Sequence, residues 1–239
     1  MKKLAQLAAI LLAGGSGSRM QSRCRDKVLE PLLGKPVFAY SLEAFHSTQI
    51  FQTVCVVYRD LQQKAALQAY VEAQPCAGIE YLWVQGGQRR QDSVFNALKS
   101  PELKADYVFI HDCARPLIQA KTLLEMWAQF PTVGGLALAH PVADSIKQQV
   151  ERSGRGRPAL QDVDRSNLWA METPQAFHYN CILQAYENVQ AQALSITDDV
   201  AAAEQADVQV TLHPNNACNL KITHPDDLQL AHFYLQGRT

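Results

Sequence analysis

The sequence predicts an α/β protein in which a mostly parallel sheet is flanked by helices. Short apolar runs alternate with segments of helical spacing along the 239 residues, and this alternation is typical of strand–helix–strand units. The first apolar run, residues 7–12, ends in glycines and has the composition of a strand that is buried on both faces. Hydrophobic residues make up 47% of the chain and charged residues 19%, so a normal buried core is expected.

The expected strands are short apolar runs that recur along the chain. After residues 7–12 they cover residues 53–58, 79–84, 106–111 and 134–140, and a last one lies near 208–212. Ligands of parallel sheets bind beyond the carboxyl ends of the strands. We therefore expect the chemistry in the loops that follow these strands.

The expected helices lie between the strands. One begins after Pro36, and a second runs from a capping residue, Asp60, to about Ala73. Further helical spacing covers residues 94–98, 123–130, 178–191 and 200–206, and the last of these can be capped within residues 197–199. A final helix is expected from about Pro225.

Residues 141–170 interrupt this alternation. They contain Gly154, Gly156 and Pro158 among several charges, and they show neither helical nor alternating spacing. A loop of this length within a compact domain is usually functional. We interpret it as an arm-like excursion from a single domain that covers residues 1–239.

Composition excludes several classes of protein. The net charge of −1 argues against a nucleic-acid partner, and no apolar run approaches the ~20 residues that span a bilayer. The six cysteines show no C-x-x-C or zinc spacing, which favours reduced thiols and a cytoplasmic protein. The start of the chain is similar to a signal peptide, but Gln6 interrupts its apolar run, so we favour a first strand.

The loop after the first strand, residues 13–20, reads AGGSGSRM and is a candidate phosphate cradle. Glycines allow backbone amides to approach anionic oxygens, and Arg19 and Lys27 could neutralise a triphosphate. A solvated basic stretch with Arg23 and Arg25 is the alternative. The loop lacks the Gly-Lys-Ser/Thr of a Walker loop, and Met20 stands where the third glycine of a dinucleotide-binding loop should be, which disfavours an NAD-binding oxidoreductase.

Several further motifs follow in order along the chain. Residues 86–94 read GGQRRQDSV and residues 111–116 read HDCARP. Residues 163–169 read VDRSNLW, with TPQ at 173–175; ITDD stands at 196–199 and NLKIT at 219–223. Together with the glycine loop, this set resembles the methylerythritol phosphate cytidylyltransferase family, and the resemblance spans residue 8 to about 232. It implies a Rossmann-like nucleotidyltransferase fold with a dimerisation arm.

The resemblance also implies the roles of individual residues. It assigns catalysis to Arg19 and Lys27, and a magnesium ion to Asp112, whose carboxylate is a hard oxygen ligand. The implied nucleotide site contains Ala13, Gly14, Gly15, Gly17, Gly86, Gly87, Arg90, Ser93, Asp112 and Cys113. The implied site for the acceptor, a polyol phosphate, contains Asp112, Arg115, Ser145, Arg165, Thr173, Thr197 and Lys221, with arm residues contributed across a homodimer.

The chain departs from the family pattern at a few positions. The family usually has Pro-Lys-Gln where this chain has Asp26, Lys27 and Val28, and the stretch before Lys27 is about one residue longer, so Arg23 or Arg25 could occupy the place of the lysine. Cys113 replaces an alanine, and Ser145 replaces a threonine but keeps the hydroxyl. None of these changes removes a group that the chemistry requires.

The implied reaction is transfer of the cytidylyl group of CTP to the acceptor phosphate, with release of pyrophosphate. The attacking phosphate oxygen is already anionic, so positioning and charge stabilisation are the work of the protein. Two alternatives stay open at this point. The acceptor could be ribitol 5-phosphate, or the chain could bind a nucleotide without turning it over.

Overall fold

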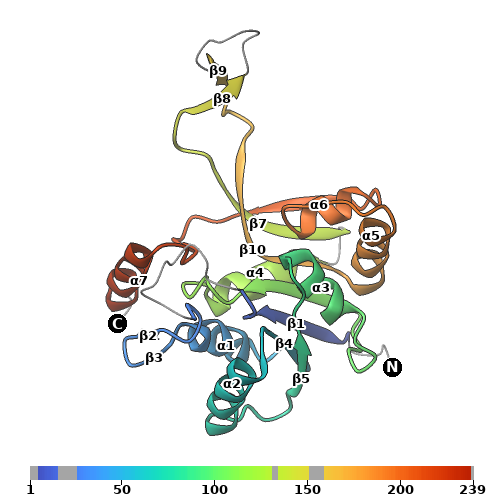
Figure 1. The fold of residues 1–239 in the computed structure, drawn as a ribbon, viewed down its shortest axis with the longest axis vertical. Coiled ribbons are helices and arrows are strands. Elements are labelled where there is room, and N and C mark those ends of the chain that lie inside the picture. The colour runs from blue at the N-terminus through green and yellow to red at the C-terminus, as the bar shows by residue number, and fades with distance from the viewer. Residues whose placement is uncertain (1–4, 16–25, 131–133, 151–158, 238–239) are drawn as a thin grey trace.

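The structure, a computed structural model, describes residues 5–15, 26–130, 134–150 and 159–237. Its centre is a seven-stranded sheet in the order β11-β7-β10-β6-β1-β4-β5 (Figure 1). The strands are β1 (Leu7–Leu12), β4 (Thr53–Tyr58), β5 (Glu80–Gln85), β6 (Tyr107–Asp112), β7 (Gly135–Pro141), β10 (Trp169–His178) and β11 (Val210–Pro214). Six of these seven strands point the same way, and β10 runs antiparallel to both of its neighbours.

Six of the strands are those that the sequence predicts, with ends that move by at most two residues. The seventh, β10, was not predicted, because its sequence contains Glu172 and Pro174 and shows no apolar alternation. Its pairing with β7 shifts register between Met171 and Gln175, which is a β-bulge, and the Thr173–Pro174 peptide bond is cis. This irregular part of β10 faces the end of β6 and therefore contributes to the site described below.

Helices cover both faces of the sheet (Figure 1). They are α1 (Val37–Thr48), α2 (Leu61–Ala73), α3 (Arg90–Leu98), α4 (Ala120–Gln129), α5 (Tyr179–Ala191), α6 (Asp199–Glu204) and α7 (Pro225–Gln236). The core has one layer on each face: α1, α2 and α4 pack against one, and α3, α5 and α6 against the other. Alternate residues of β1 enter the two layers, as the period of two in a strand requires.

Two predicted helix caps are confirmed. Asp60 begins α2 and its side chain accepts from the Gln63 backbone N–H, and Asp198 begins α6 and accepts from the Ala201 N–H. Pro225 stands in the first turn of α7, where a missing N–H is harmless. These caps fix where each helix begins after the preceding strand or loop.

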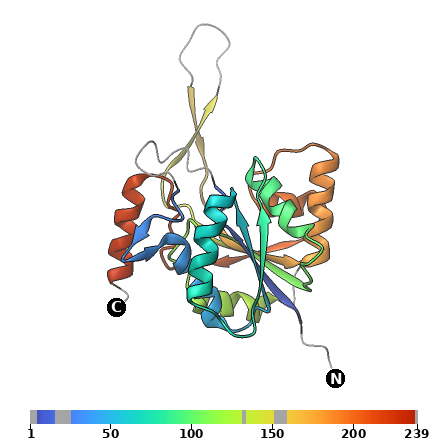
Figure 2. The same cartoon turned by 60° about the horizontal axis from the view of Figure 1, so that its bottom comes forward.

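The described residues of the stretch 141–170, which are 141–150 and 159–170, form a projection from the body of the molecule (Figures 1 and 2). It contains β8 (Ile146–Val150) and β9 (Ala159–Val163), which pair antiparallel. Most side chains of the two strands are exposed, so within this chain the hairpin has almost no core of its own. At its base the projection continues β7 and β10, where Trp169 pairs with Pro141.

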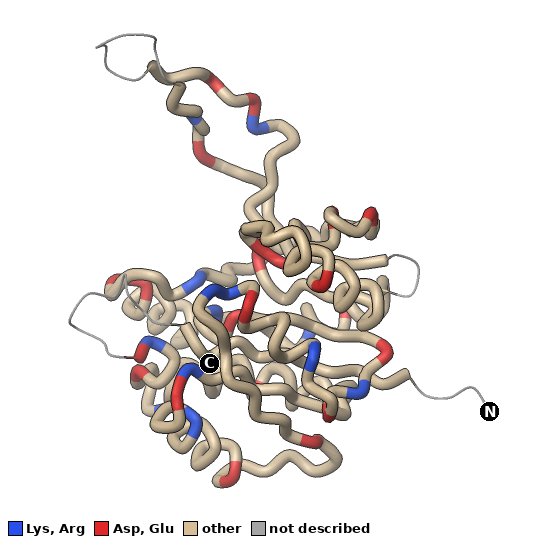
Figure 3. The backbone as a smooth tube through the Cα atoms, turned by 45° about the vertical axis from the view of Figure 1, so that its right-hand side comes forward, with Lys and Arg blue, Asp and Glu red and all other residues tan. Residues whose placement is uncertain are grey.

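A small third layer closes one side of the body. The hairpin of β2 (Pro31–Leu32) and β3 (Lys35–Pro36) and the helix α7 share a cluster of buried residues with Ile222. The segment 219–223 is thereby held beside the end of β6, where the Ile222 N–H donates to the Ala114 carbonyl at 2.8 Å. Acidic and basic residues are interspersed along the chain (Figure 3). Within the described ranges, no helix is both long and apolar enough to cross a bilayer.

Candidate active site

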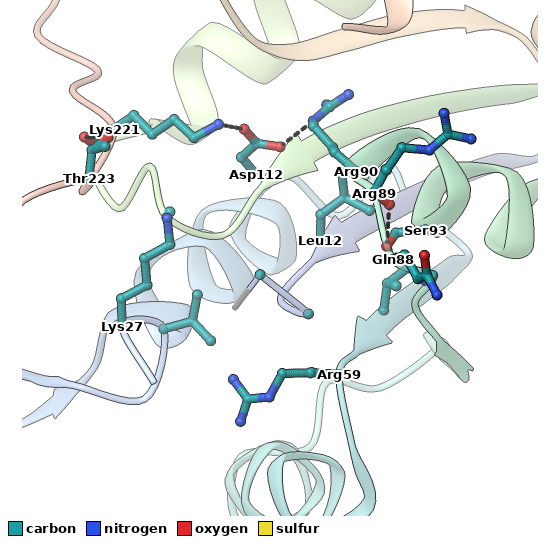
Figure 4. Close-up of a pocket in the computed structure, with 16 residues that line it drawn as sticks. Leu12, Lys27, Arg59, Gln88, Arg89, Arg90, Ser93, Asp112, Lys221 and Thr223 are labelled. Atoms are coloured by element: carbon teal, nitrogen blue, oxygen red, sulfur yellow. Dashed lines mark hydrogen bonds and ion pairs between the residues drawn. The ribbon is translucent and has the colours of Figure 1, made fainter. Parts of the chain in front are cut away.

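A cavity of about 390 Å³ lies at the carboxyl ends of β1, β4, β5 and β6 (Figure 4). This is the edge of the sheet where the sequence predicts the chemistry. Its lining includes five cationic side chains and one carboxylate, and basic groups therefore dominate it. The charged lining residues are Lys27, Arg59, Arg89, Arg90, Lys221 and Asp112.

Gly87 and Ser93 line one wall, at the turn from β5 into α3. The Gly87 N–H donates to the Ser93 Oγ at 3.1 Å, and that hydroxyl donates to the Arg89 carbonyl at 3.2 Å. A Cβ on Gly87 would lie 2.4 Å from the Asp92 Cβ, and one on Gly86 would lie 2.8 Å from the Ser93 Oγ. Glycine is therefore required at both positions for the turn to lie this close to the start of α3.

Asp112 is the centre of a buried charge network. One carboxylate oxygen accepts from the Arg90 Nε at 2.9 Å, and the other accepts from the Lys221 Nζ (Figure 4). Burial would raise the pKa of Asp112, but Arg90 and Lys221 outweigh it and hold that pKa far below its usual range. The carboxylate is therefore ionised at any working pH.

Arg90 connects Asp112 to a second carboxylate. Its Nη1 and Nη2 donate to the two oxygens of Asp199 at 2.9 and 2.8 Å, a bidentate arrangement that fixes the plane of the guanidinium. Asp199 is completely buried, and it also accepts from the Tyr186 hydroxyl at 2.6 Å. Its backbone N–H donates to the Gln175 side chain at 2.9 Å, which ties α6 to β10.

A chain of hydrogen bonds orders the backbone at the end of β6. The Asp112 N–H donates to the Thr173 Oγ1 at 3.0 Å, and that hydroxyl lies 3.2 Å from the His111 Nδ1. On the other side of the ring, the His111 Nε2 lies 3.2 Å from the Ser41 Oγ. Burial lowers the pKa of His111 to about 3, so the ring is neutral and can accept at one nitrogen while it donates at the other.

A second cavity, of about 240 Å³, adjoins the first and shares Arg90, Asp112 and Lys221 with it. The rest of its lining comes from β10, the start of α6 and the residues after β6. It consists of Arg115, Met171, Glu172, Thr173, Gln175, Thr197 and Asp198. The two cavities thus meet at Asp112 and the two cations bound to it.

Arg115 is held in the second cavity by backbone carbonyls. Its Nη1 donates to the Asn219 carbonyl at 2.7 Å and its Nη2 to the Met171 carbonyl at 3.4 Å. The Nε atom is buried and has no hydrogen-bond partner among the described residues. Burial lowers the pKa of Arg115, more than Asp112 and Glu172 raise it. The guanidinium remains charged and adds a cation to the lining of the second cavity.

Glu172, which also lines the second cavity, is a buried carboxylate with several hydrogen-bond partners. It is 3% exposed, and its carboxylate accepts from Asn215 and Asn219 at 2.8 Å each and contacts the His140 Nδ1 at 2.6 Å. One side chain thus joins β10, the end of β11 and the segment that carries Lys221. His140 lies where β7 passes into the projecting hairpin.

The structure places most of the predicted site residues at these two cavities. Gly14, Gly15, Lys27, Gly87, Arg90, Ser93, Asp112 and Lys221 line the first, and Arg115, Thr173 and Thr197 line the second. Arg19 and Gly17 lie outside the described residues. Ala13 and Cys113 are fully buried and their side chains belong to the core, while Gly86 lies in the turn behind the lining.

Ser145 and Arg165 lie elsewhere in this chain. Both are exposed, at the base of the projecting hairpin, and neither lines either of these two cavities. The Arg165 side chain donates to the Ala143 carbonyl, which joins the two roots of the hairpin. Within one chain, therefore, these two residues stay apart from the other predicted acceptor ligands.

Sequence reasoning missed several residues that shape the site. Arg59 directly follows β4, so the rule that ligands bind beyond strand ends could have found it. Arg89 stands inside a motif that was recognised, next to Arg90. Asp199 also stands in a recognised motif, residues 196–199, but the motif does not show its pairing with Arg90. Glu172 carries no such signal, because only the pairing of β10 brings its carboxylate to the site.

Comparisons with known proteins agree with this geometry. Residues 7–237 match the sequence pattern of the family described as IspD, 2-C-methyl-D-erythritol 4-phosphate cytidylyltransferase. The chain belongs to this family. Family members of that name from Shouchella clausii and Synechococcus elongatus are 34% and 36% identical to it, over 98% and 96% of both chains respectively.

Solved structures of family members have the same fold. The crystal structure of 4-diphosphocytidyl-2C-methyl-D-erythritol synthase from Anaerococcus prevotii superposes with a TM-score of 0.81, over 98% of this chain and 100% of that one. At 23% identity this match concerns the fold alone. The family predicted from the sequence motifs is confirmed: the chain is a CTP-dependent cytidylyltransferase for 2-C-methyl-D-erythritol 4-phosphate in isoprenoid precursor synthesis.

Enzymes of this family are nucleotidyltransferases that commonly need a divalent cation. The described residues contain no cluster of three or more His, Cys, Asp or Glu side chains that could hold a metal by themselves. The larger cavity offers one carboxylate, Asp112, whose two oxygens have lone pairs beyond those used by Arg90 and Lys221. This donor set fits an ion that arrives with the triphosphate and takes most of its ligands from phosphate and water.

Proposed function

We propose that the larger cavity binds CTP and that the smaller one binds 2-C-methyl-D-erythritol 4-phosphate, so that the two substrates meet at Asp112. The single observation that carries this assignment is that the two cavities share Asp112, Arg90 and Lys221. A phosphate oxygen held in the smaller cavity would then face the α-phosphate of a nucleotide in the larger one. The reaction needs this in-line approach.

The nucleotide half of the site follows from the wall residues. The Gly87 turn and the Ser93 hydroxyl offer backbone and side-chain groups at one end, where we place the cytosine and ribose. Lys27 lies across the cavity from Ser93 (Figure 4), and Gly14 and Gly15 belong to the same lining, so we place the triphosphate beside Lys27. Arg19 and Gly17, in the part of the loop that is not described, are proposed to act with them.

The acceptor half follows from the cations of the smaller cavity. Arg115 and Lys221 both line it, and together they would neutralise a phosphate monoester bound there. Thr173 and Thr197 offer hydroxyl groups for the polyol. Ser145 and Arg165 would reach an acceptor site only from the hairpin of a partner chain.

We propose that the chemical step is a direct displacement at the α-phosphorus. The acceptor phosphate is already anionic near neutral pH, so no general base is needed, and pyrophosphate leaves from the opposite side. Lys27 and Lys221 stabilise the charge that develops on the phosphoryl oxygens, and Arg90 keeps the Asp112 carboxylate fixed. Each such preorganised group contributes about 10²–10³ in rate.

The divalent cation is proposed to be Mg²⁺, held by Asp112 and by the substrate phosphates. It would supply charge neutralisation at the triphosphate oxygens. Asp112 also interacts with two cations of the protein, Arg90 and Lys221, and its fully ionised carboxylate suits these cations as well as a metal ion. The side chain thus orients Arg90 and Lys221 whether or not the metal is bound.

We further propose a cytoplasmic homodimer in which residues 1–239 act as one domain and residues 141–170 are the dimerisation arm. The exposed hairpin of β8 and β9 supports this, because two strands without a core are marginal in water unless they pack against something. Light scattering at micromolar protein concentration should give the mass of a dimer, about 53 kDa from the 26.6 kDa chain. A monomer mass would contradict the dimer.

The test of the proposed function is pyrophosphate release from CTP and Mg²⁺ with two acceptors in parallel, methylerythritol phosphate and ribitol 5-phosphate. Release should be faster with methylerythritol phosphate and should need the divalent cation, with ATP as a donor control. Faster release with ribitol 5-phosphate would show that the acceptor cavity is misassigned. Binding of CTP without turnover of either acceptor would favour a nucleotide-binding protein.

A further inference from the structure

The residue before Lys27 is a buried carboxylate. Asp26 is 9% exposed, and burial raises its pKa although Arg59 opposes this. Burying a carboxylate is costly unless it is paired and hydrogen-bonded. Asp26 meets that condition through two residues that follow β4 in the chain.

Arg59 and Gln63 are the two partners. The Asp26 Oδ2 lies 3.1 Å from the Arg59 Nη2 and accepts from the Gln63 Nε2 at 2.7 Å. The Asp26 Oδ1 accepts from the Val28 N–H at 3.3 Å. Both oxygens are therefore used, and the residues on each side of Lys27 are tied to one carboxylate.

Gln63 extends the network to the first strand. Its Nε2 also donates to the Ala13 carbonyl at 3.1 Å, and its Oε1 accepts from the Arg59 N–H at 2.6 Å. Gln63 is 1% exposed, and its amide has a partner at both its oxygen and its nitrogen. The end of β1, the end of β4 and the residue before Lys27 are thus joined through a single buried side chain.

The sequence departs from the family pattern at this point. The family usually has a proline before the lysine, and a proline ring restrains the backbone there. Asp26 has no ring, so another restraint is needed if Lys27 is to be held. Arg59 lines the nucleotide cavity but also pairs with Asp60 at 2.8 Å, so its guanidinium is held by carboxylates on two sides.

We propose that Asp26, Arg59 and Gln63 form a clamp that positions Lys27 for the triphosphate of the nucleotide. In this clamp Arg59 is a positioning residue, and it acts through Asp26. The clamp connects the lysine to the end of β4 and to the end of β1, the strand that the glycine loop follows in the sequence. The Lys27 Nζ donates to the Ile222 carbonyl at 3.1 Å, so the clamp and the segment 219–223 hold the lysine at its two ends.

This proposal rests on the proposed role of Lys27. It predicts that loss of the clamp weakens binding only of a nucleotide that carries the triphosphate. Asp26→Asn and Arg59→Met should each weaken binding of CTP about tenfold, as expected for coupled neighbours, and leave binding of CMP unchanged. The double variant should lose no more than either single one, because both remove the same restraint. Lys64→Met is the control, since it removes a nearby cation of α2 that does not line the cavity.

The experiment is isothermal titration of CTP and CMP into the four variants and the wild type, with thermal unfolding as the check that each is folded. The clamp is supported if both single variants and the double variant lose the same affinity for CTP while their affinity for CMP is unchanged. A loss with Arg59→Met but not with Asp26→Asn would overturn it and show that Arg59 contacts the nucleotide directly. Equal losses for CTP and CMP, or no losses, would also overturn it. Pyrophosphate release by the wild type tests the proposed function separately.

Discussion

Asp199→Asn tests whether the buried charge network holds the site together. The substitution keeps the shape of the side chain but removes its charge, and it places an NH₂ donor against the guanidinium of Arg90. Of the two charge-assisted hydrogen bonds of 2.9 and 2.8 Å, one is lost and the other becomes neutral at its acceptor, in a site where Asp199 is completely buried.

The loss of stability in Asp199→Asn depends on which partners Arg90 keeps. Removing one partner of a buried ion pair costs about 3–5 kcal/mol, because the other charge stays buried without its partner. Arg90 keeps Asp112 as a partner, so we expect the lower end of this range, about 3 kcal/mol. For a chain of this size that loss lowers Tm by about 6–12 °C.

Thermal unfolding followed by circular dichroism measures the effect, and Glu125→Gln is the control, because it also replaces a carboxylate by an amide. Glu125 forms an exposed i,i+4 pair with Lys121 on α4 at 3.8 Å, so this substitution should leave Tm unchanged within about 2 °C. If the Tm of Asp199→Asn fell no further than that of the control, the network would not stabilise the fold and the reasoning would be refuted.

Three further outcomes are expected. Lys27→Ala should fold normally and lose about 10²–10³ in turnover, whereas Lys121→Ala, at a position 81% exposed on α4, should keep full activity; near-normal turnover of Lys27→Ala would point to Arg23 or Arg25 instead. His111 is neutral when folded, with a pKa of about 3, and charges in the unfolded chain below about pH 6.5, so stability should fall as the pH drops from 6.5 towards 3. Between pH 6 and about 4.5, the free energy of unfolding measured with urea should fall less steeply in His111→Gln than in the wild type, by about 1.4 kcal/mol per pH unit. Equal slopes in the two proteins would contradict this. Gly87→Ala should destabilise the protein by about 1–3 kcal/mol, since its Cβ would lie 2.4 Å from the Asp92 Cβ, whereas Gly237→Ala, with its nearest atom at 3.8 Å, should change little in the same urea titration.

The candidate site was partly predictable because some of its residues stand in local motifs. Asp112 ends β6 and Arg115 follows within the same run of six residues, and Gly87 and Ser93 stand together where β5 turns into α3. A glycine turn and a carboxylate at a strand end are features of neighbouring residues, so the sequence shows them directly. Their roles as ligands of the two substrates remain predictions that the experiments above test.

The rest of the site depends on contacts between distant residues. Lys221 reaches Asp112 across 109 positions, and Asp199 reaches Arg90 across the same separation. Glu172 contacts Asn219 because the irregular part of β10 packs against the segment that carries Lys221. No local pattern encodes such pairings, since they arise only when the sheet has formed.

The sequence by itself determined the strands of the parallel sheet, the caps at Asp60 and Asp198, and the order of the motifs. These depend on burial periodicity and on hydrogen bonds between residues three apart, which are local properties. Only the tertiary structure decided the antiparallel β10, the meeting of two cavities at Asp112, and the clamp that joins Asp26 to Arg59. The physical reason is that buried charges find their partners by proximity in space, and that proximity is a property of the packed fold.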